Sequence, residues 1–158
     1  MDMTKPKPTE NKPLACTFCG HSDTSIEIKP ALQAAIEALI TDKGVTMFYV
    51  GSHGAFDFMS ANILHTLKER YPHIRAYTVL AYIPGKKEEF PIKERLETLY
   101  PDGLETVPRR YAITHRNRWM ILNSDYIISG VRHGWGGAAQ TVKFAESKGL
   151  KIVSLYQD

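Results

Sequence analysis

A glycine-rich stretch near the end of the chain combines residue types that suit phosphate binding. It reads YIISGVRHGWGGAAQTVKFAESKG over residues 126–149 and passes from an apolar run through glycines 130, 134, 136 and 137 into a helix-like pattern. Glycines between a buried strand and a helix let backbone N–H groups approach a phosphate. This turn is therefore predicted to hold a phosphorylated ligand.

Similar residue types follow the other apolar runs, where long acidic side chains are scarce. Backbone N–H groups and a helix N-terminus suit the phosphate of a nucleotide, and aromatic rings suit its base. Structural alternatives stand beside this interpretation: Gly51 and Gly54 could only permit a tight turn, His21 and His53 could be ordinary loop histidines, and Trp135 could pack on a neighbouring helix. The candidate ligand-binding residues of these turns are Gly20, His21, Ser22, Asp23, Gly51, Ser52, His53, Gly54, Phe56, Asp57, His133, Gly134, Trp135, Gly136, Gly137 and Ala138.

The segment 113–124, ITHRNRWMILNS, has a helical pattern with an unusual polar cluster. Arg116 and Met120 lie one helical turn apart and share a face, while Asn117 and Arg118 lie further around. Either the polar side chains form a solvated face, or Arg116 and Asn117 point inward at a phosphate or ribose. Arg110, in the stretch PRRY just before this helix, could reach the same ligand.

The two cysteines, Cys16 and Cys19, have a C-x-x-C spacing that could indicate metal or redox chemistry. They fall in the apolar run LACTFCG, which has the pattern of a buried strand, and residues three apart on a strand point to opposite faces. One such pair cannot hold one metal ion, so we expect two packing residues and neither metal nor cofactor.

Strands and helices alternate along the chain, which predicts a Rossmann-like α/β domain with three layers. Its mostly parallel sheet should have five strands or slightly more, with ligands bound at the carboxyl ends of the strands. The insert 86–110 is expected to be a lid or an interface and to contain a short helix over 92–100. The predicted strands are 14–20, 45–51, 74–85, 125–131 and 151–156, and the predicted helices are 30–44, 58–72, 113–124 and 136–149.

The length of 158 residues suits one domain, which we assign to 14–158, after a polar, proline-rich leader over 1–13 that we expect to be disordered. No apolar run approaches the roughly 20 residues that span a bilayer, so we expect no membrane partner and a cytoplasmic protein. The net charge of +3 is too small for a protein that coats nucleic acid, and it disfavours that class of partner.

The stretch RNRWMILNSDYIISGVRHGWGGAAQTVKFA resembles the signature of the SLOG superfamily, which groups Smf/DprA proteins with LOG-type phosphoribohydrolases. CTFCGHSDT, FYVGSHGAFD and VLAYIPG resemble a small stand-alone branch from bacteria and phages, close to the YpsA group. The resemblance covers the chain from Cys16 to Leu155. The residues that match the superfamily pattern are Arg116, Asn117, Ser124, Asp125, Gly134, Gly136, Gly137 and Ala145.

This resemblance implies a Rossmannoid fold that binds nucleotide-derived ligands. LOG-type enzymes cleave the N-glycosidic bond of a nucleoside monophosphate, and their turn reads Gly-Gly-x-Gly-Thr-x-x-Glu. Here Ala138 takes the place of the threonine, Thr141 that of the glutamate, and Asn117 that of a lysine. Glycosidic cleavage usually needs a carboxylate, and this turn supplies none; Asp23 or Asp57 from the other turns could take its place as catalytic candidates.

Three functions follow from the residues and the resemblance. We expect a binding protein that senses or sequesters a nucleotide-derived ligand, of an ADP-ribose or cyclic signalling type, in phage–bacteria immunity. The alternative is a nucleotide N-glycosidase. A third function, DprA-like binding of single-stranded DNA, would use a patch drawn from Lys86, Lys87, Arg109, Arg110, Arg116 and Arg118. The resemblance also implies a homo-oligomer, either a dimer or a tetramer.

Overall fold

The computed structural model describes residues 12–83 and 95–156. Residues 1–11 of the predicted leader, and the part of the predicted insert that precedes residue 95, lie outside the described residues. Within the described parts no helix is long and apolar enough to cross a membrane.

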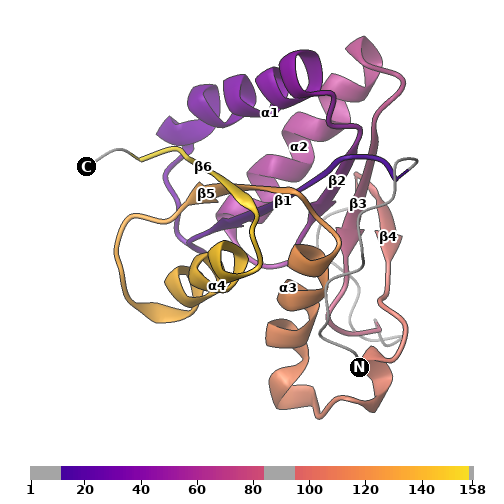
Figure 1. Ribbon diagram of the computed structural model, residues 1–158, viewed down its shortest axis with the longest axis vertical. Helices are drawn as coiled ribbons and strands as arrows, with labels where there is room; N and C mark the ends of the chain where they lie inside the picture. The colour runs from indigo at the N-terminus through magenta and orange to yellow at the C-terminus, as the bar shows by residue number, and fades with distance from the viewer. Residues whose placement is uncertain (1–11, 84–94, 157–158) are drawn as a thin grey trace.

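A parallel sheet of six strands lies at the centre of the described structure, in the order β4-β3-β2-β1-β5-β6 (Figure 1). Strands β2 to β4 are added on one side of β1, and β5 and β6 on the other, so the topological switch point lies between β1 and β5. The strands are β1 (Ala15–Gly20), β2 (Met47–Val50), β3 (Arg75–Val79), β4 (Glu97–Leu99), β5 (Tyr126–Gly130) and β6 (Lys151–Ser154).

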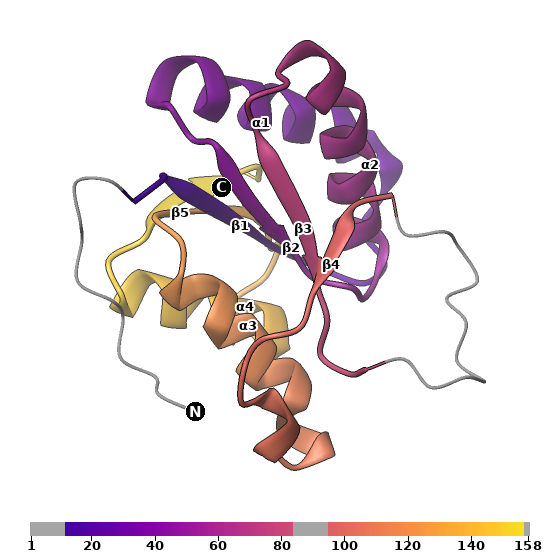
Figure 2. The same ribbon diagram turned by 90° about the vertical axis from the view of Figure 1, so that its right-hand side faces the viewer.

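Helices cover both faces of the sheet, which confirms the predicted Rossmann-like sandwich of three layers. Helices α1 (Lys29–Lys43) and α2 (Ala55–Arg70) pack together on one face, and α3 (Ala112–Leu122) and α4 (Gly136–Ser147) pack together on the other (Figures 1 and 2). Three short 3-10 helices, Ile26–Ile28, Leu104–Thr106 and Arg109–Tyr111, lie in the connections of the described residues. All four α-helices begin and end near their predicted bounds.

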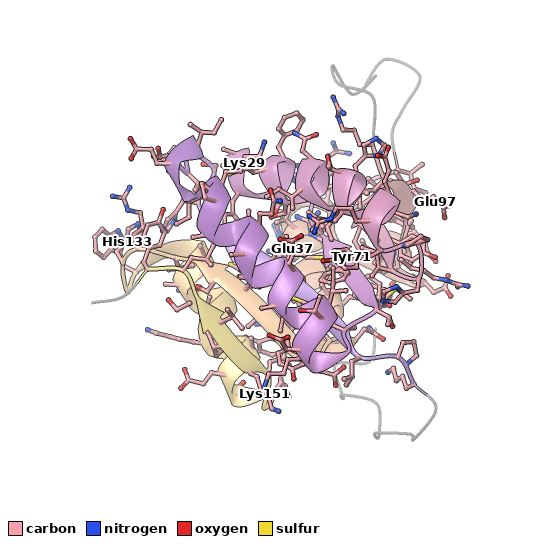
Figure 3. All side chains as sticks on the ribbon, turned by 90° about the horizontal axis from the view of Figure 1, so that it is seen from above. Lys29, Glu37, Tyr71, Glu97, His133 and Lys151 are labelled. Atoms are coloured by element: carbon pink, nitrogen blue, oxygen red, sulfur yellow. The ribbon has the colours of Figure 1, made fainter. Side chains whose placement is uncertain are left out.

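Helix α1 shows which sequence signals predict where a helix begins and ends. Its buried residues Leu32, Ile36, Leu39 and Ile40 recur at helical spacing, and Pro30 lies in its first turn, where a missing N–H costs nothing. Gly44 ends the helix in the left-handed conformation, with φ of 72°. Figure 3 shows α1 and α2 lying over the sheet, where Glu37 of α1 pairs with Arg70 of α2 at 2.8 Å.

The two cysteines belong to separate hydrophobic clusters, one on each side of the sheet. Cys16 packs with Phe18, Phe48 and the α1 and α2 side chains, whereas Cys19 packs with Ile121 and Ile127 on the α3 and α4 side. Both are buried and neither forms a disulfide. The prediction that they point to opposite faces is confirmed.

The edge strand β4 corrects two predictions about secondary structure. The prediction of a short helix over 92–100 is wrong for Glu97–Leu99, because these residues form a strand that pairs in parallel with β3. The strand expected over 74–85 ends at Val79, and Leu80 donates its N–H to Leu99 across the same ladder. The open edge of β3 offers hydrogen bonds that outweigh the helix propensity of a short segment.

Phe56 lies beneath the carboxyl ends of the two central strands, and this corrects its predicted role as a ligand contact. The side chain is 1% exposed, in the core between α2 and the sheet. A Cβ added at Gly20 or Gly130, which face each other in β1 and β5, would come closer than 3.0 Å to the Phe56 ring. These two glycines therefore leave room for the ring.

We predict that Gly20→Ala lowers the free energy of unfolding by about 1–3 kcal/mol, because the new methyl group overlaps the buried Phe56 ring. Urea denaturation measures the change. Gly137→Ala is the matched control, since a Cβ there meets nothing within 4 Å. Adding Phe56→Leu to Gly20→Ala should recover part of the loss, and additive effects of the two changes would contradict the assigned contact.

Candidate functional site

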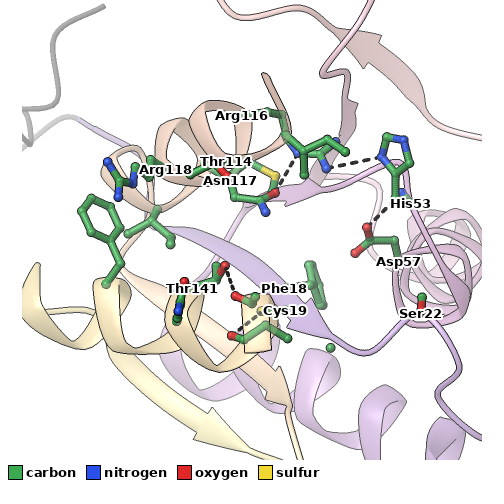
Figure 4. Close-up of a pocket in the computed structure, with 18 residues that line it drawn as sticks. Phe18, Cys19, Ser22, His53, Asp57, Thr114, Arg116, Asn117, Arg118 and Thr141 are labelled. Carbon is green, nitrogen blue, oxygen red and sulfur yellow. Dashed lines mark hydrogen bonds between the residues drawn. The ribbon is translucent and has the colours of Figure 1, made fainter. Parts of the chain in front are cut away.

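A pocket of about 340 Å³ opens at the carboxyl end of β1, between α3 and α4 (Figure 4). Its size lies within the range of small-molecule sites. It brings together side chains that are far apart in the sequence, from the turns after β1 and β2, from α3, and from the start of α4. The predicted ligand-binding residues that line it are Gly20, Ser22, His53, Asp57, Arg116, Asn117, Gly137 and Ala138.

Arg116 enters this pocket from α3 and is almost completely buried, with 2% of its surface exposed. Its Nη1 donates to the Val79 carbonyl at 2.9 Å and to Ser52 Oγ at 3.0 Å. Its Nε donates to Asn117 Oδ1 at 2.8 Å. Of the two sequence interpretations, the structure therefore favours an Arg–Asn pair that points inward, because a solvated face would leave the guanidinium exposed.

The charge of Arg116 forms no salt bridge within residues 12–83 and 95–156, and all its acceptors named above are neutral. Burial lowers the pKa of the guanidinium, and the nearby Asp57 carboxyl acts in the opposite direction. A buried cation held by neutral acceptors attracts anions more strongly than one in water, because the local dielectric is low.

Asp57 lies in the first turn of α2 and faces the same pocket. Its carboxylate accepts the N–H of His53 at 3.1 Å. Burial raises the pKa of Asp57 to about 6, although Arg116 and the His53 N–H both favour the charged form. Gly51 brings the two charges near each other, since a Cβ there would meet the Asp57 carboxylate at 2.6 Å and the Arg116 guanidinium carbon at 3.4 Å.

His53 joins this cluster without adding a charge at neutral pH. Its Nδ1 lies 3.5 Å from Arg116 Nη2 and 3.3 Å from Ser52 Oγ. Burial and the positive charge of Arg116 both lower the pKa of His53. The imidazole is therefore mostly neutral at pH 7, and its Nδ1 can accept from the guanidinium.

The N-terminus of α4 forms the opposite wall of the pocket. The helix begins at Gly136, whose φ of 88° suits glycine, and its N-cap Trp135 makes no side-chain capping bond. Gly137 and Ala138 line the pocket in the first helical turn, where backbone N–H groups lack helical partners. These N–H groups and Arg116 are the features that suit an anion.

The remaining predicted residues lie outside the pocket. Asp23 is exposed and absent from the lining, whereas Gly54 is the N-cap of α2, with φ of 94°, and packs against Ser22. Arg110 is exposed with its guanidinium carbon 4.8 Å from the Tyr111 ring centre. His21, His133 and Trp135 stack on one another beside the exposed Gly134.

Comparisons with known proteins give a fold but no family. No family model matches the chain, and no curated protein sequence matches it. The DNA processing protein A (DprA) structure from Streptococcus pneumoniae aligns with a TM-score of 0.63 and 14% identity, covering 90% of this chain and 50% of that one. DprA from Helicobacter pylori, solved for its single-stranded DNA binding mode, aligns with a TM-score of 0.65 and 18% identity, covering 94% of this chain and 67% of that one. This chain has a DprA-like Rossmann fold.

A second set of residues lines the pocket that the sequence analysis did not name as ligand contacts, although it assigned one of them, Arg118, to the candidate DNA-binding patch. They extend the pocket into a groove between α3 and α4, where Arg118 lies with its guanidinium carbon 4.9 Å from the Phe144 ring centre. Helical spacing was the available signal, because positions 113, 117 and 120 share a face of α3, and 137, 141 and 144 share a face of α4. The added lining residues are Phe18, Cys19, Ile113, Thr114, Arg118, Met120, Ile121, Gln140, Thr141 and Phe144.

We predict that Asp57→Asn becomes more stable relative to the unmodified chain as the pH rises. The folded-state pKa of Asp57, about 6, lies above its ordinary value of 3.8, so the folded state binds more protons between these values. Between roughly pH 4 and pH 7, the free energy of unfolding of the unmodified chain should therefore fall by about 1–3 kcal/mol relative to that of the variant. Urea denaturation at several pH values measures this difference, and a constant difference would contradict the desolvation of Asp57.

Proposed function

We propose that the chain binds a nucleotide-derived ligand whose phosphate lies in the pocket. The observation that carries the proposal is the buried guanidinium of Arg116, which lines the pocket and is held by neutral acceptors. A phosphate could approach it and also accept N–H groups from the first turn of α4. Within the described residues, Asp57 is the one carboxylate that lines this pocket, so repulsion of an anion is limited.

The ligand class and the biological role come from the SLOG-type resemblance. The resemblance favours an ADP-ribose-type or cyclic signalling nucleotide that the protein senses or sequesters, as a homo-oligomer. Holding rather than cleaving is favoured because Thr141 stands where LOG-type enzymes have a glutamate, and its hydroxyl donates to the Gly137 carbonyl at 2.9 Å. A thermal-shift panel of nucleoside monophosphates, cyclic nucleotides and ADP-ribose identifies the class, and no shift at saturation would contradict the proposal.

We predict that Arg116→Lys weakens ligand binding by about thirtyfold or more. The lysine retains a positive charge but loses the planar donors that Arg116 directs at Val79, Ser52 and Asn117, which corresponds to about 2 kcal/mol or more. Calorimetry with the ligand found in the panel measures the change. Arg95→Ala is the control, because Arg95 is exposed next to β4, and equal affinities of the two variants would contradict the site.

A nucleotide N-glycosidase is the second candidate, and the position of Asp57 favours it. A carboxyl whose pKa lies near 6 and that faces the pocket can act as an acid or a base near neutral pH. If the chain is this enzyme, Asp57→Asn should reduce release of free base from nucleoside monophosphates at least a hundredfold. Asp23→Asn should leave the rate unchanged, because Asp23 is exposed outside the pocket. Chromatography of the products decides the question.

Single-stranded DNA binding is the third candidate, favoured by the fold shared with the Helicobacter pylori protein. Arg116 is buried and is not part of a surface patch, whereas Arg110 and Arg118 are exposed and Arg109 lies over the Tyr82 ring at 4.4 Å. If DNA binds at these exposed arginines, affinity for an oligothymidylate should fall steeply as the salt concentration rises. Arg110→Ala should reduce the slope of the logarithm of the binding constant against the logarithm of the salt concentration by about 1. Filter binding from low to moderate salt measures both quantities.

A further inference from the structure

Three aromatic rings form a continuous column beside the pocket. The rings of His21 and His133 stack with centres 4.4 Å apart and planes 24° apart. The ring of His133 stacks in turn on Trp135, with centres 3.7 Å apart and planes 19° apart. The column joins the turn after β1 to the turn after β5, the two strands that flank the switch point. In Figure 3, His133 lies at the edge of the molecule opposite Glu97.

Backbone hydrogen bonds hold both histidines in this column. His21 Nε2 accepts the N–H of Arg132 at 3.0 Å, so its proton lies on Nδ1 in the neutral form. His133 Nδ1 lies 2.9 Å from the Trp135 carbonyl, which can only accept, so this nitrogen donates. The rings are thus oriented before any ligand arrives, which lowers the entropy cost of binding.

The column ends in an open surface. Trp135 is 70% exposed although one face of its ring lies on His133. Gly134 and Gly136 flank it, and a Cβ added at Gly134 or Gly137 would meet nothing within 4 Å. A flat group therefore has room to stack on the tryptophan.

We propose that this column, which we call the ring column (His21, His133 and Trp135), is the platform on which the nucleobase of the ligand stacks. The proposal rests on the proposed function for the phosphate. The ring column adjoins the pocket along the chain, because His21 follows the lining residue Gly20, and Trp135 precedes the first turn of α4, which holds Gly137. The ligand class is then a nucleotide with a flat heterocycle, rather than a sugar phosphate alone.

Fluorescence tests the ring column directly, because the chain has 2 tryptophans. Trp119 is partly buried, edge-on to Tyr49 at 5.2 Å, so Trp119→Phe leaves Trp135 as the remaining tryptophan, whose emission is excited selectively at wavelengths that tyrosine does not absorb. In this variant, adenosine monophosphate should quench the emission, and ribose 5-phosphate should not. No quenching by adenosine monophosphate, adenosine or an oligothymidylate would overturn the proposal.

Binding affinities distinguish the contribution of the base from that of the phosphate. Trp135→Ala should lower the affinity for adenosine monophosphate by about 5- to 150-fold, the usual loss for one stacked base. It should lower the affinity for ribose 5-phosphate much less. If Phe144→Leu gives this selective loss and Trp135→Ala does not, the base lies in the groove between α3 and α4, and the proposal is wrong. Calorimetry measures both ligands against both variants.

The two proposals fail in distinguishable ways. Binding of ribose 5-phosphate that depends on Arg116, with no added effect of a base, would retain the phosphate site and overturn the ring column. Quenching of Trp135 by adenosine, without any binding that depends on Arg116, would retain the ring column and overturn the phosphate site. Quenching by oligothymidylate but not by adenosine monophosphate would overturn the proposal, because Trp135 would then stack on single-stranded nucleic acid and not on the base of a nucleotide held in the pocket.

Discussion

The burial of one guanidinium charge is the constraint on which the carboxyl edge of this sheet depends. Moving the charge of Arg116 out of water costs several kcal/mol, and its neutral partners Val79, Ser52 and Asn117 offset only part of that cost. These partners belong to the end of β3, the turn after β2 and α3 itself, so the buried charge ties three elements together. An anion that enters the pocket meets a cation whose donors are already oriented, and little reorganisation opposes binding.

The two central strands make this edge accessible by leaving out side chains. Gly20 and Gly130 end β1 and β5 in register, and the Phe56 ring fills the space below them. These two strand ends therefore carry no side chain, because the buried ring occupies the space that a Cβ would need. An apolar core residue therefore determines which residues can occupy the ends of the two strands that flank the switch point.

In the proposed function, the phosphate and the base of a nucleotide bind in two different environments, the pocket and the ring column. The pocket offers a buried cation and helix N–H groups, which suit phosphate, and the ring column offers an exposed flat face, which suits a base. Asp57 is compatible with either function, because its carboxyl lies near Arg116 and its pKa is raised to about 6. The N-glycosidase and the binding protein would use the same pocket, and they differ in whether this carboxyl takes part in a reaction.

Local patterns in the sequence were sufficient for strands β1, β2, β3, β5 and β6, for the four α-helices, for the three layers, and for the edge at which the turns meet, because periodicity and glycine positions are local properties. They also placed Arg116 and Asn117 on one helix. Only the tertiary structure decided that Arg116 is buried, that Asp57 faces the pocket while Asp23 does not, and that Phe56 belongs to the core. It also decided that residues 97–99 form a strand and that His21 stacks on His133. Each of these outcomes depends on neighbours distant in the chain, whose contacts no local pattern encodes.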